Sequence, residues 1–123
     1  MSAKASKRHR LLRRLADLLE SSALLREQLV HYERETKKMI KRIESGERAV
    51  LAGVGTDVAS LRRQVTESMQ QFEAARHRLR LAFMALAREE GDSISEVARV
   101  LGVSRQLASR LAGEADGSDA EGS

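Results

Sequence analysis

The 123-residue sequence contains no cysteine and no proline, and aromatic residues make up only 2% of it. The absence of cysteine excludes disulfide bonds, thiol catalysis and cysteine-ligated zinc. The absence of proline removes the residue that most often breaks helices, and the small aromatic content leaves little material for a β-sheet. We therefore expect an all-α chain.

Long apolar runs and reactive clusters are absent as well. No stretch approaches the roughly 18 apolar residues that a membrane span requires, and no secretory apolar core follows the basic N-terminus. The histidines, His9, His31 and His77, are far apart in the sequence and have no metal-ligand spacing. No set of nucleophile, base and acid can be recognised. We expect a cytoplasmic protein without enzymatic activity, metal, cofactor or membrane association.

Charged residues make up 33% of the chain, and their distribution is uneven. The net charge is +4, but residues 113–123 carry four acids and no base: Glu114, Asp116, Asp119 and Glu121. The rest of the chain is therefore more basic than the total suggests. A basic chain is suited to bind an anionic partner, and nucleic acid is a better candidate than an acidic membrane surface. The positive charge would also be explained by solubility alone. The small, Gly- and Ser-rich segment 113–123 predicts a disordered acidic tail.

Basic residues also dominate the beginning of the chain, where the first acid is Asp17. Residues 1–8 predict a flexible basic arm. Such an arm could contact nucleic-acid phosphates or a minor groove, and a frayed, solvated terminus is the simpler interpretation.

Heptad patterns of apolar residues predict two long helices. The first runs from about Arg8 to Ser45 and the second from near Asp57 to Glu90, where Gly91 suits the position after a helix end. Together they make residues 9–73 a helical hairpin or coiled coil, paired either within one chain or between two chains. The first pattern consists of Leu11, Leu18, Leu25, Tyr32 and Met39, alternating with Leu15, Leu29 and Ile43.

A break near residues 45–56 separates the two helices. Residues 47–52 could add a short helical turn, and residues 53–57 form a joint with Thr56 or Asp57 as the N-cap of the second helix. The Gly-Val-Gly at residues 53–55 is interpreted as a hinge. A phosphate-binding loop would need a Gly-Lys-Ser/Thr ending and a preceding strand, and neither is present.

The segment from Ser93 to Leu111, SISEVARVLGVSRQLASRL, has the features of two short helices joined by a tight turn. Ser93 and Glu96 predict a capping box for a helix from Ile94 to about Leu101. Gly102 suits the left-handed residue that ends it, and Ser104 suits the N-cap of a second helix from Arg105 to about Ala112. A three-residue turn forces the sharp crossing that projects the second helix outward. The predicted inward-facing residues are Val97, Ala98, Leu101, Val103, Ala108 and Leu111.

The run from Glu96 to Gln106, EVARVLGVSRQ, resembles the helix-turn-helix of small homeodomain-like bacterial transcriptional regulators. The resemblance covers about residues 74–112 if the end of the second long helix supports the motif, and it implies a DNA-binding domain there. The sequence departs from the family at Leu107-Ala108, where a small residue and then a β-branched residue are usual. Leu107 could pack in the core or could be exposed and contact a thymine methyl group.

The exposed side of the second motif helix is the expected reading surface, since Arg can pair with guanine and Gln with adenine in the major groove. The predicted base-reading residues are Arg105, Gln106, Ser109 and Arg110. The predicted phosphate contacts are Ser93, Ser104, Arg76, Arg78, Arg80 and Arg99. For each arginine, base reading and phosphate contact remain alternatives.

The function predicted from these features is that of a sequence-specific transcriptional regulator. It would bind double-stranded DNA in the bacterial nucleoid as a homodimer formed through the N-terminal helices. A nucleoid-associated architectural protein with weak sequence preference is the alternative. A third hypothesis is that the motif contacts a protein of the transcription machinery.

Overall fold

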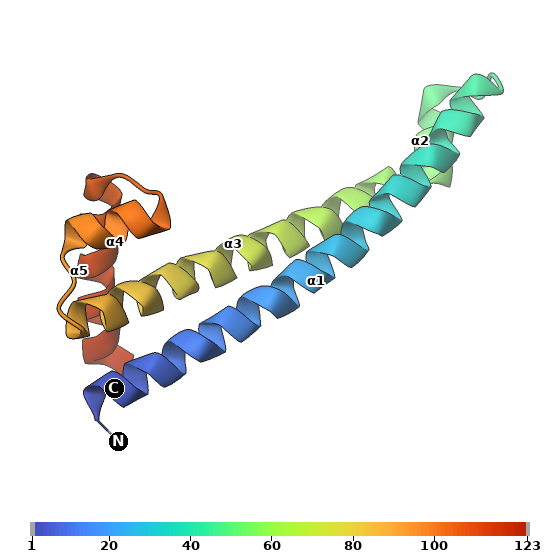
Figure 1. Cartoon of the computed structure of the whole chain (residues 1–123). Helices are drawn as coiled ribbons and strands as arrows, with labels where there is room; N and C mark the ends of the chain where they lie inside the picture. The colour runs from blue at the N-terminus through green and yellow to red at the C-terminus, as the bar shows by residue number, and fades with distance from the viewer. Residues whose placement is uncertain (1, 123) are drawn as a thin grey trace. The chain divides into compact units, whose positions relative to one another are not determined.

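The computed structural model describes residues 2–122, and of residues 118–122 it describes the backbone alone. Within residues 2–122 the chain has five helices and no strand, which confirms the predicted all-α class (Figure 1). None of these helices is both long enough and apolar enough to cross a membrane. The helices are α1 (Ala3–Glu44), α2 (Ala49–Gly55), α3 (Val58–Glu89), α4 (Ile94–Leu101) and α5 (Arg105–Gly122).

The chain divides into two compact units. The terminal unit contains the residues up to Leu18 and those from Ala74 onward, and the hairpin unit contains Leu19–Glu73. The long helices α1 and α3 contribute to both units.

The hydrophobic core of the terminal unit lies where α4 and α5 meet the last turns of α3. Small residues let these helices approach one another closely, and three larger side chains fill the centre. Those three, Met84, Val97 and Leu111, are almost completely buried. Alanines complete the core at residues 85, 87, 98, 108, 112 and 115.

The beginning of α1 belongs to the terminal unit, so the predicted flexible arm is wrong for residues 3–8; Met1 lies outside the described residues. The hydroxyl of Ser2 accepts a hydrogen bond from the N–H of Ala5 at 3.0 Å and so caps the N-terminus of α1. Lys7 then pairs with Glu89 at 2.9 Å, and Arg8 pairs with Glu90 at 3.4 Å. Glu89, the last residue of α3, and Glu90, which follows it, thus neutralise the positive charges of Lys7 and Arg8, which the sequence predicted to belong to a free arm.

Helix α5 continues to Gly122, so residues 113–117 are helical where the sequence predicted the start of a disordered tail; Ser123 lies outside the described residues. The apolar stripe of α5 extends beyond Gly113, where the tail was predicted to begin. Ala112 and Ala115 are both buried in the core, and Ala115 is only 3% exposed. An amphipathic stripe that packs on the core stabilises a helix whose composition alone would favour disorder.

In the hairpin unit, α1 and α3 lie side by side within one chain (Figure 1). His31 and Glu35 of α1 share a groove with Ser60 and Gln64 of α3. Few side chains in this unit are buried, and those are Ala52, Thr56, Leu61 and Ser68. A pair of helices alone leaves much of its apolar surface in contact with solvent.

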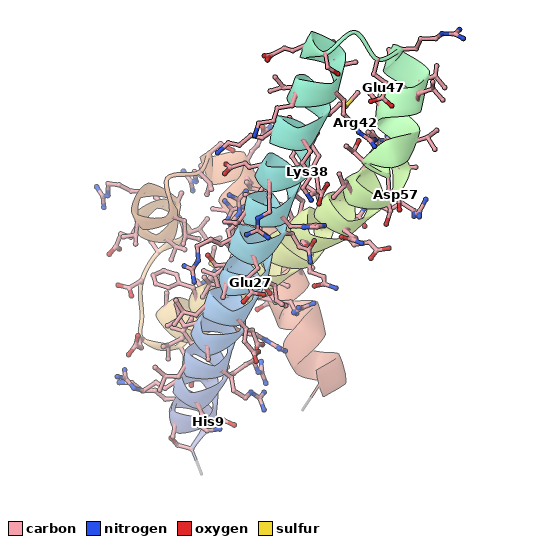
Figure 2. All side chains as sticks on the ribbon, turned by 90° about the vertical axis from the view of Figure 1, so that its right-hand side faces the viewer. His9, Glu27, Lys38, Arg42, Glu47 and Asp57 are labelled. Atoms are coloured by element: carbon pink, nitrogen blue, oxygen red, sulfur yellow. The ribbon has the colours of Figure 1, made fainter. Side chains whose placement is uncertain are left out.

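The turn of the hairpin unit is built around α2 (Figure 2). The sequence left Thr56 and Asp57 as alternative N-caps of the second long helix, and Asp57 takes this position, where its Oδ1 accepts the N–H of Ser60 at 3.4 Å. Asp57 has a φ of 49°, a left-handed conformation that Asp tolerates better than most residues. Arg42 pairs with Glu47 at 3.4 Å, and its guanidinium occupies the space that a Cβ at Gly55 would need.

Candidate nucleic-acid interface

Helix α4 begins with the predicted capping box. The hydroxyl of Ser93 accepts the backbone N–H of Glu96 at 3.1 Å, and the Glu96 carboxylate accepts the backbone N–H of Ser93 at 3.3 Å. The hydrogen bond from this backbone N–H lowers the pKa of Glu96 below its ordinary value, and the Ser93 hydroxyl adds to the effect. Glu96 is therefore ionised at neutral pH, where it also complements the positive end of α4.

Helix α4 ends at Gly102, whose φ of 68° is left-handed as predicted. The N–H of Val103 donates to the carbonyl of Ala98 at 3.0 Å, which closes the turn after the helix. The hydroxyl of Ser104 then accepts the N–H of Leu107 at 3.1 Å and caps α5. Three residues thus carry the chain from one helix to the next, as the sequence predicted.

The two motif helices pack through the predicted small and apolar residues. Val97 and Ala98 of α4 are buried, as are Ala108 and Leu111 of α5. Leu107 is half-buried and packs against this core, which favours the first of the two roles that the sequence left open for it.

The outward side of α5 carries all four predicted base-reading residues. Arg105, Gln106, Ser109 and Arg110 are exposed, while the residues between them turn inward. The spacing of 100° per residue places Gln106, Ser109 and Arg110 on one face and Arg105 at its edge. An exposed polar row at the start of the second motif helix is the arrangement that reads base edges in the major groove. Which of these side chains contact bases stays a prediction.

A groove beside α5 brings together residues from three helices. Its volume is about 430 Å³, and its lining includes Arg88 of α3, Ser93 and Ser95 at the start of α4, and Arg105 of α5. The free N–H groups at the start of α4 and the two guanidinium groups make this groove suitable for a phosphate. Asp92 also lines it and lowers its net positive charge. Arg88 was not predicted from the sequence, where it is one base among many near the end of a helix.

Residues 74–115 match the family model of a homeodomain-like domain. The match covers about a third of the chain and confirms the resemblance seen in the sequence. It includes the second half of α3, all of α4 and the first part of α5. A helix-turn-helix domain of this kind indicates DNA binding. No curated protein and no solved structure shows significant similarity to the chain.

The other predicted phosphate contacts are spread over the homeodomain-like domain. Arg99 is exposed on α4, whereas Arg76 and Arg80 are half-buried on α3. Arg78 lines a different cavity, together with two arginines of α1. The structure therefore places Arg99 on α4, and Ser93 and Ser104 at the N-caps of α4 and α5, whereas the other three arginines lie on α3.

Acidic residues limit the part of α5 that can approach DNA. Glu114 and Asp116 are exposed on its later turns, and Glu114 lies 2.8 Å from His77 of α3. Carboxylates next to DNA phosphates are unfavourable, especially where the local dielectric is low. The candidate reading surface of the homeodomain-like domain is therefore the first two turns of α5, from Arg105 to Arg110.

Proposed function

We propose that the protein is a sequence-specific transcriptional regulator that reads the DNA major groove with the first two turns of α5. The supporting observation is the exposed row Arg105, Gln106, Ser109 and Arg110 on a capped helix of a homeodomain-like domain. Phosphate contacts come from Ser93, Ser104 and Arg99, with Arg88 added by the groove next to Arg105. The bacterial nucleoid within the cytoplasm is the proposed location.

Homodimerisation through the hairpin unit is part of this proposal. One helix-turn-helix motif makes a small interface, and two motifs on two half-sites raise both affinity and specificity. The hairpin unit buries few side chains but exposes many large apolar ones, among them Leu19 at 74% and Val50 at 76%. Two such hairpins can cover these side chains in a four-helix arrangement. The exposed apolar residues of the unit also include Leu24, Leu29, Val30, Tyr32, Ile40, Ile43, Leu51, Val54, Val58 and Met69.

Selection of bound sites from random double-stranded DNA tests the reading function. The purified full chain should enrich a short motif with two related half-sites. A chain that binds DNA but enriches no motif would instead be the architectural protein of weak sequence preference. A chain that binds no DNA would contradict both and would leave a protein partner of the transcription machinery as the target.

A pair of matched variants locates the reading surface. Arg105→Ala with Gln106→Ala should weaken binding to the selected site by about 2–6 kcal/mol, from about 1–3 kcal/mol for each bidentate contact. Arg63→Ala with Gln71→Ala removes the same two residue types from exposed positions of α3 in the hairpin unit and should leave the affinity unchanged. Equal effects of the two pairs would show that α5 does not read bases.

Sedimentation of the full chain tests dimerisation. We expect a dimer at micromolar concentrations and dissociation when Leu19 and Val30 are both replaced by Asp. A wild-type chain that remains monomeric at tens of micromolar would contradict this part of the proposal.

A further inference from the structure

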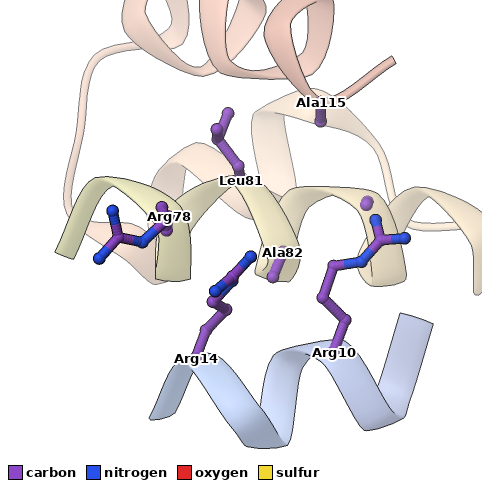
Figure 3. A pocket seen from close by; sticks show the side chains of 7 residues that line it. Arg10, Arg14, Arg78, Leu81, Ala82 and Ala115 are labelled. Atoms are coloured by element: carbon purple, nitrogen blue, oxygen red, sulfur yellow. The ribbon is translucent and has the colours of Figure 1, made fainter. Parts of the chain in front are cut away.

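Helix α1 packs on α3 through one of its sides. In the terminal unit, Arg10 and Arg14 extend from α1 toward α3 (Figure 3). In the hairpin unit, the half-buried residues of α1 recur mainly at steps of three and four along the helix, and Glu35 among them shares a groove with α3. They also include Ser21, Leu25, Gln28, Met39 and Arg42. The contact with α3 leaves the other sides of α1 exposed to solvent.

A second row of residues on α1 also has the spacing of a coiled-coil seam, because its successive members are three and four residues apart in alternation. At 100° per residue, the row lies about 110° around the helix from the side that packs on α3, and all of its side chains are exposed. Its apolar members are at least 41% exposed. We call this row the outer seam, and it consists of Leu19, Ser22, Arg26, Leu29, Glu33, Thr36, Ile40 and Ile43.

In the hairpin unit, the exposed apolar surface of the two long helices is concentrated on α1. Among the described residues of this unit, α3 exposes only Val58 and Met69 as large apolar side chains, whereas α1 exposes Leu19, Leu24, Leu29, Val30, Tyr32, Ile40 and Ile43. Helix α1 of a second copy is therefore a better match for the outer seam than α3 of a second copy. Contact of α1 with α1 places identical surfaces against each other, as a two-fold axis requires.

Arg26 and Glu33 decide the orientation of such a pair, because they are the charged members of the outer seam. Neither side chain forms an ion pair or a hydrogen bond within the described residues. They are two helical turns apart, about 10 Å along the axis, and so do not pair with each other. In a parallel pair in register, each would face its own copy, which places like charges together. In an antiparallel pair with Leu29 near the two-fold axis, Arg26 lies beside Glu33 of the second copy, and this contact occurs twice.

We propose that the outer seam binds the outer seam of a second copy of the chain, with the two α1 helices antiparallel and Leu29 near the two-fold axis. Each Arg26 then pairs with Glu33 of the other copy, and each Leu19 packs beside Ile40 of the other copy. Burial of the apolar side chains supplies the affinity, and the two ion pairs select the orientation. This inference rests on the proposed homodimer and assigns its contact surface.

Cross-linking of single-cysteine variants tests the orientation, because the natural sequence contains no cysteine. The full chain is treated with a short bismaleimide, and covalent dimers are separated on a denaturing gel. Leu29→Cys should cross-link to itself. Leu19→Cys and Ile40→Cys should not do so alone, since equivalent positions lie roughly 30 Å apart along antiparallel helices. Mixed and allowed to exchange subunits, these two variants should cross-link to each other.

Val50→Cys is the matched control, because Val50 is exposed but lies on α2, outside the outer seam. It should give no covalent dimer. Covalent dimers of Leu19→Cys alone or of Val50→Cys would overturn the antiparallel seam and leave the homodimer intact. A lack of cross-linking by Leu29→Cys in a chain that sediments as a dimer would have the same meaning. A wild-type chain that stays monomeric would overturn both the outer seam and the homodimer.

Charge exchange tests the pairing of Arg26 with Glu33. Arg26→Glu should weaken the dimer about tenfold, because two attractions become repulsions, and Glu33→Arg should do the same. The two changes together restore opposite charges and should recover most of the wild-type affinity. Arg34→Glu, an exposed change on α1 outside the outer seam, is the matched control with no expected effect. In a parallel dimer neither single change would matter, so wild-type affinity of both single variants would overturn the pairing.

Selection of DNA sites by the wild-type chain separates this inference from DNA reading. The residues changed in the cross-linking and charge variants all lie in the hairpin unit and not in the homeodomain-like domain. A chain that shows the expected cross-links but enriches no DNA motif would support the outer seam and contradict the sequence-specific regulator. A chain that enriches a motif but shows the cross-links of a parallel pair would overturn the outer seam and support the regulator.

Discussion

His77 Nε2 of α3 lies 2.8 Å from Glu114 Oε2 of α5, and one residue further along α5 the side chain of Ala115 is buried in the core. The two groups of the pair are about half exposed, so the pair contributes at most about 1 kcal/mol to stability. The buried alanine adds about as much. Together these contacts make the later turns of α5 part of the fold of the terminal unit.

Truncation tests this role of α5. A chain that ends at Ala112 should lose about 1–2 kcal/mol in its free energy of unfolding, because the His77–Glu114 pair and the Ala115 contact are both absent. A chain that ends at Gly117 keeps both and should unfold like the full chain. Urea unfolding followed by circular dichroism measures the difference. Identical stability of the two truncated chains would mean that residues 113–117 add nothing to the fold.

Leu107 should act through stability and not through sequence preference. It packs against the core of the terminal unit, so Leu107→Ala should lower the free energy of unfolding by about 1–3 kcal/mol, below the range for fully buried leucines. Val100 of α4 is 70% exposed, and Val100→Ala is the matched control with little expected effect. The motif selected from random DNA should be the same for both variants. A stable Leu107→Ala chain that has lost a preference for thymine would support the alternative role.

The Ser93–Glu96 capping box should make part of the stability depend on pH. Because folding lowers the pKa of Glu96, its contribution is present above its unfolded pKa of about 4.3 and is lost as the pH falls through the lower folded value. Glu96→Gln should therefore reduce the loss of stability that follows as the pH falls below about 4.3. Glu67→Gln, on the exposed side of α3, is the matched control.

Ser93 itself can be tested at neutral pH. Ser93→Ala removes the hydroxyl that caps α4 and should cost about 0.5–2 kcal/mol. Ser93→Asn restores a capping oxygen and should recover most of this loss. If the alanine variant unfolded like the wild type, the cap would not limit the stability of the terminal unit.

The contact between Arg42 and Gly55 predicts non-additive effects of mutation in the hairpin unit. Gly55→Ala must displace the guanidinium and weaken its pair with Glu47, which offsets up to about 1 kcal/mol gained by replacing a helical glycine. The single change should therefore alter stability little. In an Arg42→Ala background the space is free, and the same change should stabilise the hairpin unit. A double-mutant cycle from urea unfolding measures this coupling, and strict additivity would show that the two side chains do not compete for space.

The sequence alone was sufficient to predict the helix-turn-helix because its determining contacts are local. The two partners of the capping box are three residues apart, and the same separation joins the Ser104 hydroxyl to the N–H of Leu107. The left-handed turn at Gly102 likewise depends on the glycine itself. Local chemistry of this kind can be recognised in a sequence without knowledge of the rest of the fold.

The ends of the terminal unit could not be predicted in this way, because their partners are distant in the chain. Lys7 and Glu89 are 82 residues apart, and His77 and Glu114 are 37 residues apart. Composition predicted a flexible arm and a disordered tail, since charged or Gly-rich segments bury little apolar surface by themselves. Packing on α3 supplied the missing partners and made both segments helical.

The sequence by itself thus determined the helical class, the two motif helices and the side of α5 that carries Arg105, Gln106, Ser109 and Arg110, because periodicity and caps act over a few residues. Only the tertiary structure decided that residues 3–8 and 113–117 join the same unit, that Arg88 shares a groove with Arg105, and that Arg10, Arg14 and Arg78 surround one cavity. The physical reason is that Arg10 and Arg14 are far from Arg78 in the sequence. Only the packing of α1, α3 and α5 brings the three side chains to the lining of one cavity.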